Sequence, residues 1–215
     1  MILLCSATEF EIKPTLDWLA SHDIADIQTF ITGVGAPSTM YMVMKAIMQD
    51  KPQLIIQAGI AGSFKKDINK GSVVIVESEQ WCDLGIEDNE QFLDLFDMGF
   101  AKPNELPYSN SLISCQFHQT GIEHLQKVKA VTANTAHGNE QTINKIIAKY
   151  NPDIESMEGA ALAHICAMEH IPFIQIRSIS NFVEARNRNN WDIPLAIKNL
   201  NIELRELLLK NNFYR

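Results

Sequence analysis

The stretch SMEGAALAHICAMEHIPFIQIRSIS, residues 156–180, contains a helical pattern followed by an apolar, strand-like run. Small and apolar residues after the first acid predict a buried helix over 158–169. The run PFIQIRSIS, over 172–180, is rich in β-branched residues and predicts a strand. Glu158 stands at the start of the helix, where a carboxylate must be paired or desolvated. This stretch therefore predicts one unit of an α/β fold with a candidate site residue at its start.

The same alternation extends through the rest of the chain. Strand-like apolar runs cover 1–7, 26–35, 53–62, 71–81, 128–136, 153–158 and 172–180. Helical patterns lie near 10–20, 37–50, 139–149, 158–169 and 193–210. Several strands are apolar on both faces, which favours a central sheet covered by helices, and the strand over 71–81 could be antiparallel. We expect an α/β fold with a mixed sheet, from which the acidic stretch 82–112 departs as a solvated loop or as a cover over a pocket.

Length and composition limit the class of protein. The 215 residues, 46% of them hydrophobic, predict a single domain over 1–215. A formal net charge of -8 and the lack of a basic cluster argue against nucleic acid and membrane surfaces as partners. We find no signal peptide and no membrane-spanning run, so a cytoplasmic protein is expected. Four cysteines without metal-type spacing predict buried free thiols, and no metal motif occurs.

Ligands of open α/β sheets bind beyond the carboxyl ends of the strands, so the residues that follow the apolar runs form the candidate site. These residues are Thr8, Glu9, Gly33, Gly35, Gly59 to Gly62, His137, Gly138, Met157, Glu158, Ser180 and Asn181. Glu9 and Glu158 could divide the roles of base and ligand-binding group. Each could instead be a first-turn acid that the helix dipole favours.

Two glycine-containing loops follow strands. TGVGAPS, over 32–38, lacks the third glycine and the acid of a dinucleotide site, so no cofactor is expected. AGIAGSF, over 58–64, has small residues that could form a wall against a flat ring or a sugar, with Gly59, Ile60 and Ala61 as its members. Close packing of a strand against a helix explains the second loop equally well.

Four stretches together resemble the purine nucleoside phosphorylase and nucleosidase superfamily. ATEFEI (7–12), AGIAG (58–62), the stretch 156–180 and the acidic helix that closes the chain carry the resemblance over nearly the whole chain. Within that superfamily, DLGIEDNEQFLDLFDMGF (83–100) and IRSISNFVEARNRNNWDIPLAI (176–197) resemble the futalosine hydrolases, which remove hypoxanthine from futalosine. The resemblance implies a phosphorylase/hydrolase-like three-layer sandwich and a homo-oligomer.

The resemblance also implies roles for individual residues. Glu9 would activate the attacking water, and Glu158 would bind ribose hydroxyls while Met157 packs against the sugar. His137 would stack on the base or is an ordinary loop residue. Phe182 and Arg186 are candidates for contacts with the aromatic carboxylate on the 5' side of futalosine.

Asn181 departs from the aspartic acid that adenine-specific nucleosidases carry after this serine. An amide can donate a hydrogen bond to a 6-oxopurine, whereas an ionised acid can only accept, so Asn181 predicts hypoxanthine. The first arginine of the chain is Arg177, which disfavours a phosphate site and favours water as the nucleophile. The alternatives are a methylthioadenosine/S-adenosylhomocysteine or aminodeoxyfutalosine nucleosidase, or a non-catalytic nucleoside-binding protein.

Overall fold

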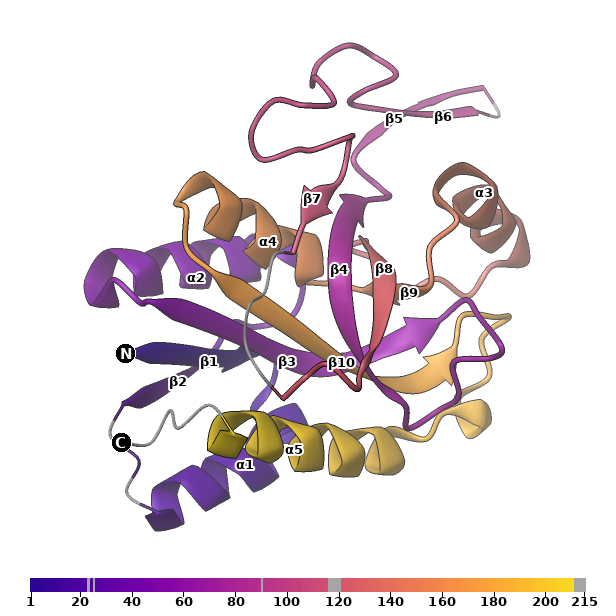
Figure 1. The fold of residues 1–215 in the computed structure, drawn as a ribbon. Helices are drawn as coiled ribbons and strands as arrows, with labels where there is room; N and C mark the ends of the chain where they lie inside the picture. The colour runs from indigo at the N-terminus through magenta and orange to yellow at the C-terminus, as the bar shows by residue number, and fades with distance from the viewer. Residues whose placement is uncertain (23, 25, 90, 116–120, 211–215) are drawn as a thin grey trace.

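The computed structural model describes residues 1–22, 24, 26–89, 91–115 and 121–210 (Figure 1). The elements in chain order are β1 (Ile2–Ser6), α1 (Glu9–His22), β2 (Ile27–Ile31), α2 (Ala36–Asp50), β3 (Leu54–Ser63), β4 (Val73–Trp81), β5 (Gly85–Asp88), β6 (Gln91–Asp94), β7 (Ile113–Ser114), β8 (Gln126–Thr132), α3 (Glu140–Tyr150), β9 (Ile154–Ser156), α4 (Gly159–Met168), β10 (Phe173–Phe182), the short 3-10 helix η1 (Arg188–Asn190) and α5 (Ile193–Lys210).

Among the described residues, eight strands form one mixed sheet, and β5 and β6 pair separately as a hairpin. Strand β3 is parallel to both β1 and β10. Strand β4 is antiparallel to β10 and parallel to β8, so the predicted mixed sheet and its antiparallel member are confirmed. Since β9 pairs with both β8 and β3, the five strands β3, β10, β4, β8 and β9 form a closed circuit of pairings.

Helices lie against both faces of the sheet. Figure 1 shows α2 and α4 on one face and α1 and α5 on the other. The first pair packs on the sheet through Val43 and Ile47 of α2 and Leu162 of α4. The second pair contributes an apolar stripe from α5, made of Leu200, Leu204, Leu207 and Leu208. Within the described part of the chain, no helix is both long and apolar enough to cross a bilayer.

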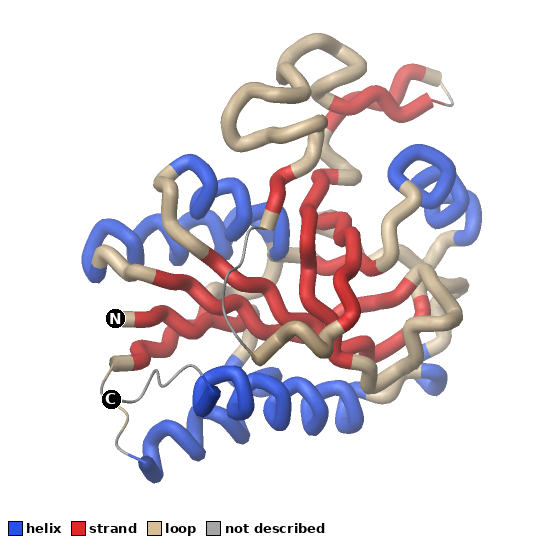
Figure 2. Tube along the Cα trace, in the orientation of Figure 1, coloured by secondary structure: helices blue, strands red, loops and turns tan. Residues whose placement is uncertain are grey.

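The five predicted helices correspond to α1 through α5, and the sequence pattern misplaces their ends by no more than a few residues. The stretch 82–112 forms the β5–β6 hairpin and a long loop (Figure 2). This excursion stands beyond the end of β4, and it does not line the cavity described below. It lines a second cavity instead, which shares His137 with the first and is bordered by Cys82, Asp83, Gly85, Glu87 and Phe92.

All four cysteines are free and buried, as predicted. Burial raises the pKa of the Cys5 thiol to about 12, although the nearby Arg177 charge acts in the opposite direction. Burial also raises the pKa values of Cys82, Cys115 and Cys166 above the usual range of a thiol. The four side chains are therefore protonated packing groups of the core.

Candidate active site

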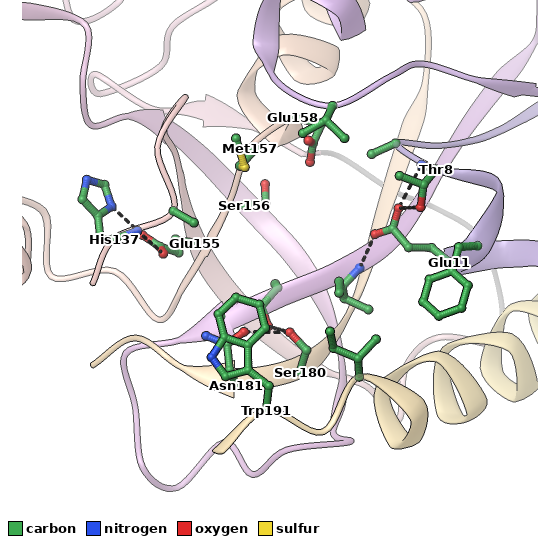
Figure 3. Close-up of a pocket in the computed structure, with 18 residues that line it drawn as sticks. Thr8, Glu11, His137, Glu155, Ser156, Met157, Glu158, Ser180, Asn181 and Trp191 are labelled. Carbon is green, nitrogen blue, oxygen red and sulfur yellow. Dashed lines mark hydrogen bonds and ion pairs between the residues drawn. The ribbon is translucent and has the colours of Figure 1, made fainter. Parts of the chain in front are cut away.

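A cavity of about 280 Å³ opens beside the ends of β1, β3, β9 and β10 (Figure 3). Nine of the candidate site residues line it, namely Thr8, Ile60, Ala61, Gly62, His137, Met157, Glu158, Ser180 and Asn181. The lining contains three carboxylates, those of Glu11, Glu155 and Glu158, and no Lys or Arg side chain among the described residues. No cluster of three or more potential metal ligands occurs within the described ranges. The described lining of the cavity is therefore acidic.

Glu11 is the acid that α1 directs into the pocket. Its side chain is buried, and the Oε2 atom accepts hydrogen bonds from Ser6 Oγ at 3.0 Å and from Thr8 N and Oγ1 at 3.0 and 2.9 Å. The Oε1 atom accepts from Ile60 N at 3.0 Å. A carboxylate oxygen has two lone pairs, so Oε1, which accepts one hydrogen bond, keeps one lone pair for a ligand. Glu11 is therefore held as a rigid base with one open acceptor position.

The predicted position of Glu9 in the cleft is wrong. The Glu9 side chain is 62% exposed and lies 3.6 Å from Lys13 Nζ, outside the pocket. The two acids are two residues apart in α1, which turns by about 100° per residue, so their side chains leave the helix on nearly opposite sides. Glu11 shares the buried face with Thr15 and Leu19 at i+4 and i+8. This spacing was the sequence signal that distinguishes Glu11 from Glu9.

Glu158 enters the pocket from the start of α4. The side chain is 6% exposed, and Oε1 accepts from Gly35 N at 2.9 Å, at the start of α2. Glu158 is the N-cap residue of α4 and makes no side-chain capping bond, so the interpretation of Glu158 as an acid that the helix dipole favours stays open. Ser156 Oγ accepts from Gly159 N instead, at 3.1 Å. The carboxylate of Glu158 is thus available to a ligand.

Burial raises the pKa of Glu158, while the charge of Arg177 and the hydrogen bond from Gly35 act in the opposite direction. Arg177 is 1% exposed and donates from Nη2 to Gln57 Oε1 at 2.7 Å, underneath the pocket rather than in its lining. Its buried charge faces several acids at once and favours their ionised forms. Arg177 therefore stabilises the acidic pocket from below.

A second buried carboxylate, Glu79, lies directly beneath the turn that carries Glu158. Thr132 Oγ1 donates to Glu79 Oε2 at 3.0 Å, and no hydrogen-bond partner occurs for Oε1 within the described ranges. A Cβ atom at Gly159 would clash with this Oε1, which explains a glycine after Glu158. Burial raises the pKa of Glu79 to about 7, against the opposing charge of Arg177.

Asn181 lies at the opposite end of the pocket from Glu11 (Figure 3). Ser180 Oγ donates to Asn181 Oδ1 at 2.8 Å, and Asn181 Nδ2 donates to Phe182 O at 3.0 Å. These two bonds fix which amide atom is the donor. One N–H of Asn181 remains for a ligand.

His137 lines the same end of the pocket and pairs with Glu155. The ring Nδ1 lies 2.7 Å from Glu155 Oε2, and His137 N donates to Glu155 Oε1 at 3.1 Å. Both side chains are only 9% exposed. Glu155 stands inside a strand-like run, and no local pattern marks it as a site residue. The predicted stacking of His137 on a base stays a prediction.

Three predicted contacts do not line the cavity. Gly59 packs against the guanidinium of Arg177, so its role is close packing rather than ligand contact. Phe182 lies under Lys66, whose Nζ is 4.1 Å from the ring centroid. Arg186 is exposed, with Cζ 5.8 Å from the ring centroid of Trp191, which does line the pocket. Arg186 thus stands near the rim of the site.

The model of the phosphorylase superfamily matches residues 27–209 of this chain. The chain belongs to the phosphorylase superfamily. This membership confirms the resemblance in the sequence, and it agrees with a pocket at the strand ends of a mixed sheet. The family includes proteins of several activities, so the reaction has to be inferred from the site.

Two kinds of superfamily member are similar to this chain at comparable identity. A futalosine hydrolase of Streptomyces coelicolor is 29% identical over 171 residues, which cover 77% of this chain and 71% of that protein. A 5'-methylthioadenosine/S-adenosylhomocysteine nucleosidase of Glaesserella parasuis is 25% identical over 183 residues, covering 80% and 75%. The solved futalosine hydrolase of Helicobacter pylori has a TM-score of 0.77 at 14% identity and covers 96% of each chain, which shows the shared fold.

Proposed function

We propose that the protein is an N-ribosyl hydrolase that cleaves futalosine and releases hypoxanthine. The observation that carries this proposal is a pocket with two acids at one side, an amide at the far end and no cationic lining among the described residues. The similarity to named futalosine hydrolases and nucleosidases supports the reaction class. An alternative substrate is methylthioadenosine or S-adenosylhomocysteine, which the similarity to the second kind of relative favours.

Water is the proposed nucleophile. A phosphate dianion in this pocket would face Glu11, Glu155 and Glu158 without a Lys or Arg side chain in the described lining, which is a repulsive environment. A neutral water molecule can donate to the open lone pair of Glu11 Oε1 and keep its own lone pair directed at the sugar carbon. The general-base role that the sequence assigned to Glu9 is therefore proposed for Glu11.

The proposed reaction follows from charge placement. As the glycosidic bond lengthens, its electron pair leaves with the purine and positive character builds on the ribose. Glu158 accepts hydrogen bonds from the ribose hydroxyls, and Met157 packs on the sugar. Water then attacks the sugar carbon and passes a proton to Glu11. Asn181 donates a hydrogen bond to the departing purine, which stabilises its negative charge. The purine anion then takes a proton from solvent water, and Glu11 returns its proton to solvent, which regenerates the base.

Partners beyond the nucleoside and water follow from the surface. Met48 and Tyr41 on α2 are 70% and 67% exposed, and Met40 and Met44 lie beside them. A homo-oligomer, a dimer or a higher-order assembly, is proposed to cover this face, as expected from the sequence. The cytoplasmic location expected from the sequence stays a prediction. A second subunit is proposed to cover the cavity that contains Glu11 and Glu158, which residues 82–112 of the same chain do not line. Arg186 at the rim is proposed to contact the 5' carboxylate.

The deciding experiment is incubation of the purified protein with futalosine, aminodeoxyfutalosine, methylthioadenosine and inosine, each with and without phosphate. Base release is followed by chromatography. Hypoxanthine release from futalosine without phosphate is the expected result. Release of adenine without hypoxanthine would mean that an adenine nucleoside, and not futalosine, is the substrate. A strict requirement for phosphate would mean that the reaction is phosphorolysis and not hydrolysis.

A further inference from the structure

Three neighbouring strands place Asn181, Gly62 and Glu155 in one row across the sheet. Asn181 of β10 is the register partner of Gly62 in β3, and Gly62 is the register partner of Glu155 in β9. Registered partners in adjacent strands point to the same face. Because Gly62 has no side chain, the amide, the carboxylate and a methyl group of Val183 all border the position that a Cβ atom would take there. Both residues line the pocket at the end remote from Glu11 (Figure 3).

The distances around Gly62 show that Asn181 and Glu155 lie close to each other. A Cβ atom placed on Gly62 would lie 2.9 Å from Val183 Cγ2, 3.1 Å from Asn181 Nδ2 and 3.6 Å from Glu155 Cγ. The free N–H of Asn181 is therefore a donor on one side of Gly62. On the other side, Glu155 presents a carboxylate, which when ionised can only accept.

His137 holds Glu155 in this position. It donates to both carboxylate oxygens, from its backbone N to Oε1 and from its ring to Oε2. The ring must carry its proton on Nδ1 because a carboxylate only accepts. Each oxygen keeps a second lone pair, so Glu155 can accept from a ligand while it stays bound to His137.

We propose that Glu155 is a specificity-determining residue that accepts the N1–H of a 6-oxopurine, while Asn181 donates to O6 or N7 of the same base. This inference rests on the proposed function only in taking the ligand to be a purine. A 6-oxopurine carries a donor at N1 and an acceptor at O6, which matches the acceptor and donor across Gly62. Adenine carries a lone pair at N1, and a carboxylate facing it is repulsive. His137 is a positioning residue in this arrangement.

Free bases test the inference without turnover. Isothermal titration with hypoxanthine, adenine and 1-methylhypoxanthine is compared for the wild-type protein, Glu155→Gln and Glu155→Ala, with the exposed Glu105→Gln as matched control. The wild type is expected to bind hypoxanthine on the order of 10- to 100-fold more tightly than either other base. Glu155→Gln should shrink the preference over adenine about tenfold. Glu155→Ala, which removes the acceptor and opens space, should bind hypoxanthine and 1-methylhypoxanthine about equally.

Each alternative outcome overturns the inference. Equal wild-type affinity for adenine and hypoxanthine would do so, as would an equal loss for both bases in Glu155→Gln, which indicates a structural role. If Glu155→Ala does not fold, the wild-type and Glu155→Gln comparisons still decide. If the wild-type protein prefers hypoxanthine but does not cleave futalosine, the proposed function is wrong and the inference about Glu155 stands. If the protein cleaves futalosine but Glu155→Gln keeps the base preference of the wild type, the inference about Glu155 is wrong and the proposed function stands.

His137 provides a second readout through a conservative variant. His137→Asn keeps an N–H that can reach Glu155, whereas His137→Ala does not. The preference for hypoxanthine over adenine is expected to fall about three- to tenfold in His137→Ala and to recover in His137→Asn. A loss that is the same in both variants, or that affects both bases alike, contradicts a positioning role.

Discussion

The two ends of the pocket are held in different ways. Glu11 and Glu158 accept from three backbone N–H groups, those of Thr8, Ile60 and Gly35, and Glu11 also accepts from the hydroxyls of Ser6 and Thr8. At the other end, one backbone N–H, that of His137, donates to Glu155, and the ring of His137 and the hydroxyl of Ser180 supply the side-chain bonds. A backbone N–H persists under every substitution except proline, whereas the bonds from the Ser180 and His137 side chains are lost when those residues are replaced. The proposed chemistry therefore lies at the end with more backbone donors, and the proposed choice of base lies at the end with fewer.

The largest expected effect tests the end of the pocket that contains Glu11 and Glu158. Glu11→Gln removes the general base and should lower kcat for futalosine by about 10³- to 10⁴-fold, because proton abstraction and water orientation are both lost. Hypoxanthine affinity should stay near the wild-type value, since Glu11 is remote from Asn181. Steady-state kinetics and titration give the two numbers. Glu9→Gln is the matched control, expected within about twofold of wild type, and a severe loss there would return the base role to Glu9.

Glu158→Gln is expected to have the next largest effect. Loss of charge-assisted hydrogen bonds to two ribose hydroxyls should lower kcat/KM by about 10²- to 10³-fold. The free base has no ribose, so hypoxanthine affinity should remain within about twofold. Parallel kinetics and calorimetry test this separation. Weakened binding of the free base would mean that the two ends of the pocket are not independent.

Glu79 allows a pH test of the layer beneath Glu158. Burial raises its pKa from 4.5 to about 7, so the folded protein favours the neutral carboxyl. The corresponding stability is fully present below about pH 4.5 and is lost as the pH rises through about 7. At about 1.4 kcal/mol per pH unit, the loss reaches roughly 3 kcal/mol. Urea unfolding at pH 5, 6.5 and 8 should show this decline in wild type.

The matched variant is Glu79→Gln, which is neutral at every pH. As the pH rises, the free energy of unfolding of the variant should increase relative to that of the wild type. The reason is that the variant has no carboxyl group at position 79 that must ionise. Arg177 faces Glu79, and its attraction for the ionised carboxylate is already contained in the raised pKa of Glu79 in the wild type. Stability curves that run parallel from pH 5 to pH 8 would show that Glu79 keeps an ordinary pKa.

The smallest expected effect concerns the end of the pocket that contains Asn181 and Glu155. Asn181→Asp replaces a donor by an acceptor and should shift the ratio of kcat/KM for inosine over adenosine toward adenosine by about 10- to 100-fold. Competition assays with both nucleosides measure this ratio directly. Unchanged base preference in this variant would remove Asn181 from base recognition and leave the choice of substrate open.

Local patterns in the sequence were sufficient for the sheet and for the position of Glu158. Apolar runs mark strands, and the small residues after Glu158 predict a helix that can pack closely. The register between β9 and β3 was not predictable, because pairing across about ninety residues depends on tertiary contacts rather than local pattern. Glu155 was missed for this reason, as its partner Gly62 is defined only by that register. Glu9 and Glu11 were confused for a local reason, since both stand in the first turn of one helix.

The buried cysteines have a practical consequence for all these measurements. Cys5 and Cys166 lie in the cluster between the sheet and α2 and α4 and are 0% exposed, whereas Cys82 borders a second cavity. A water-soluble thiol reagent can react with Cys5 and Cys166 only in molecules whose core has opened. The labelling rate of these two cysteines thus reports spontaneous opening of the native protein. Any variant above can be checked for intact packing by a colour reaction in the assay buffer itself.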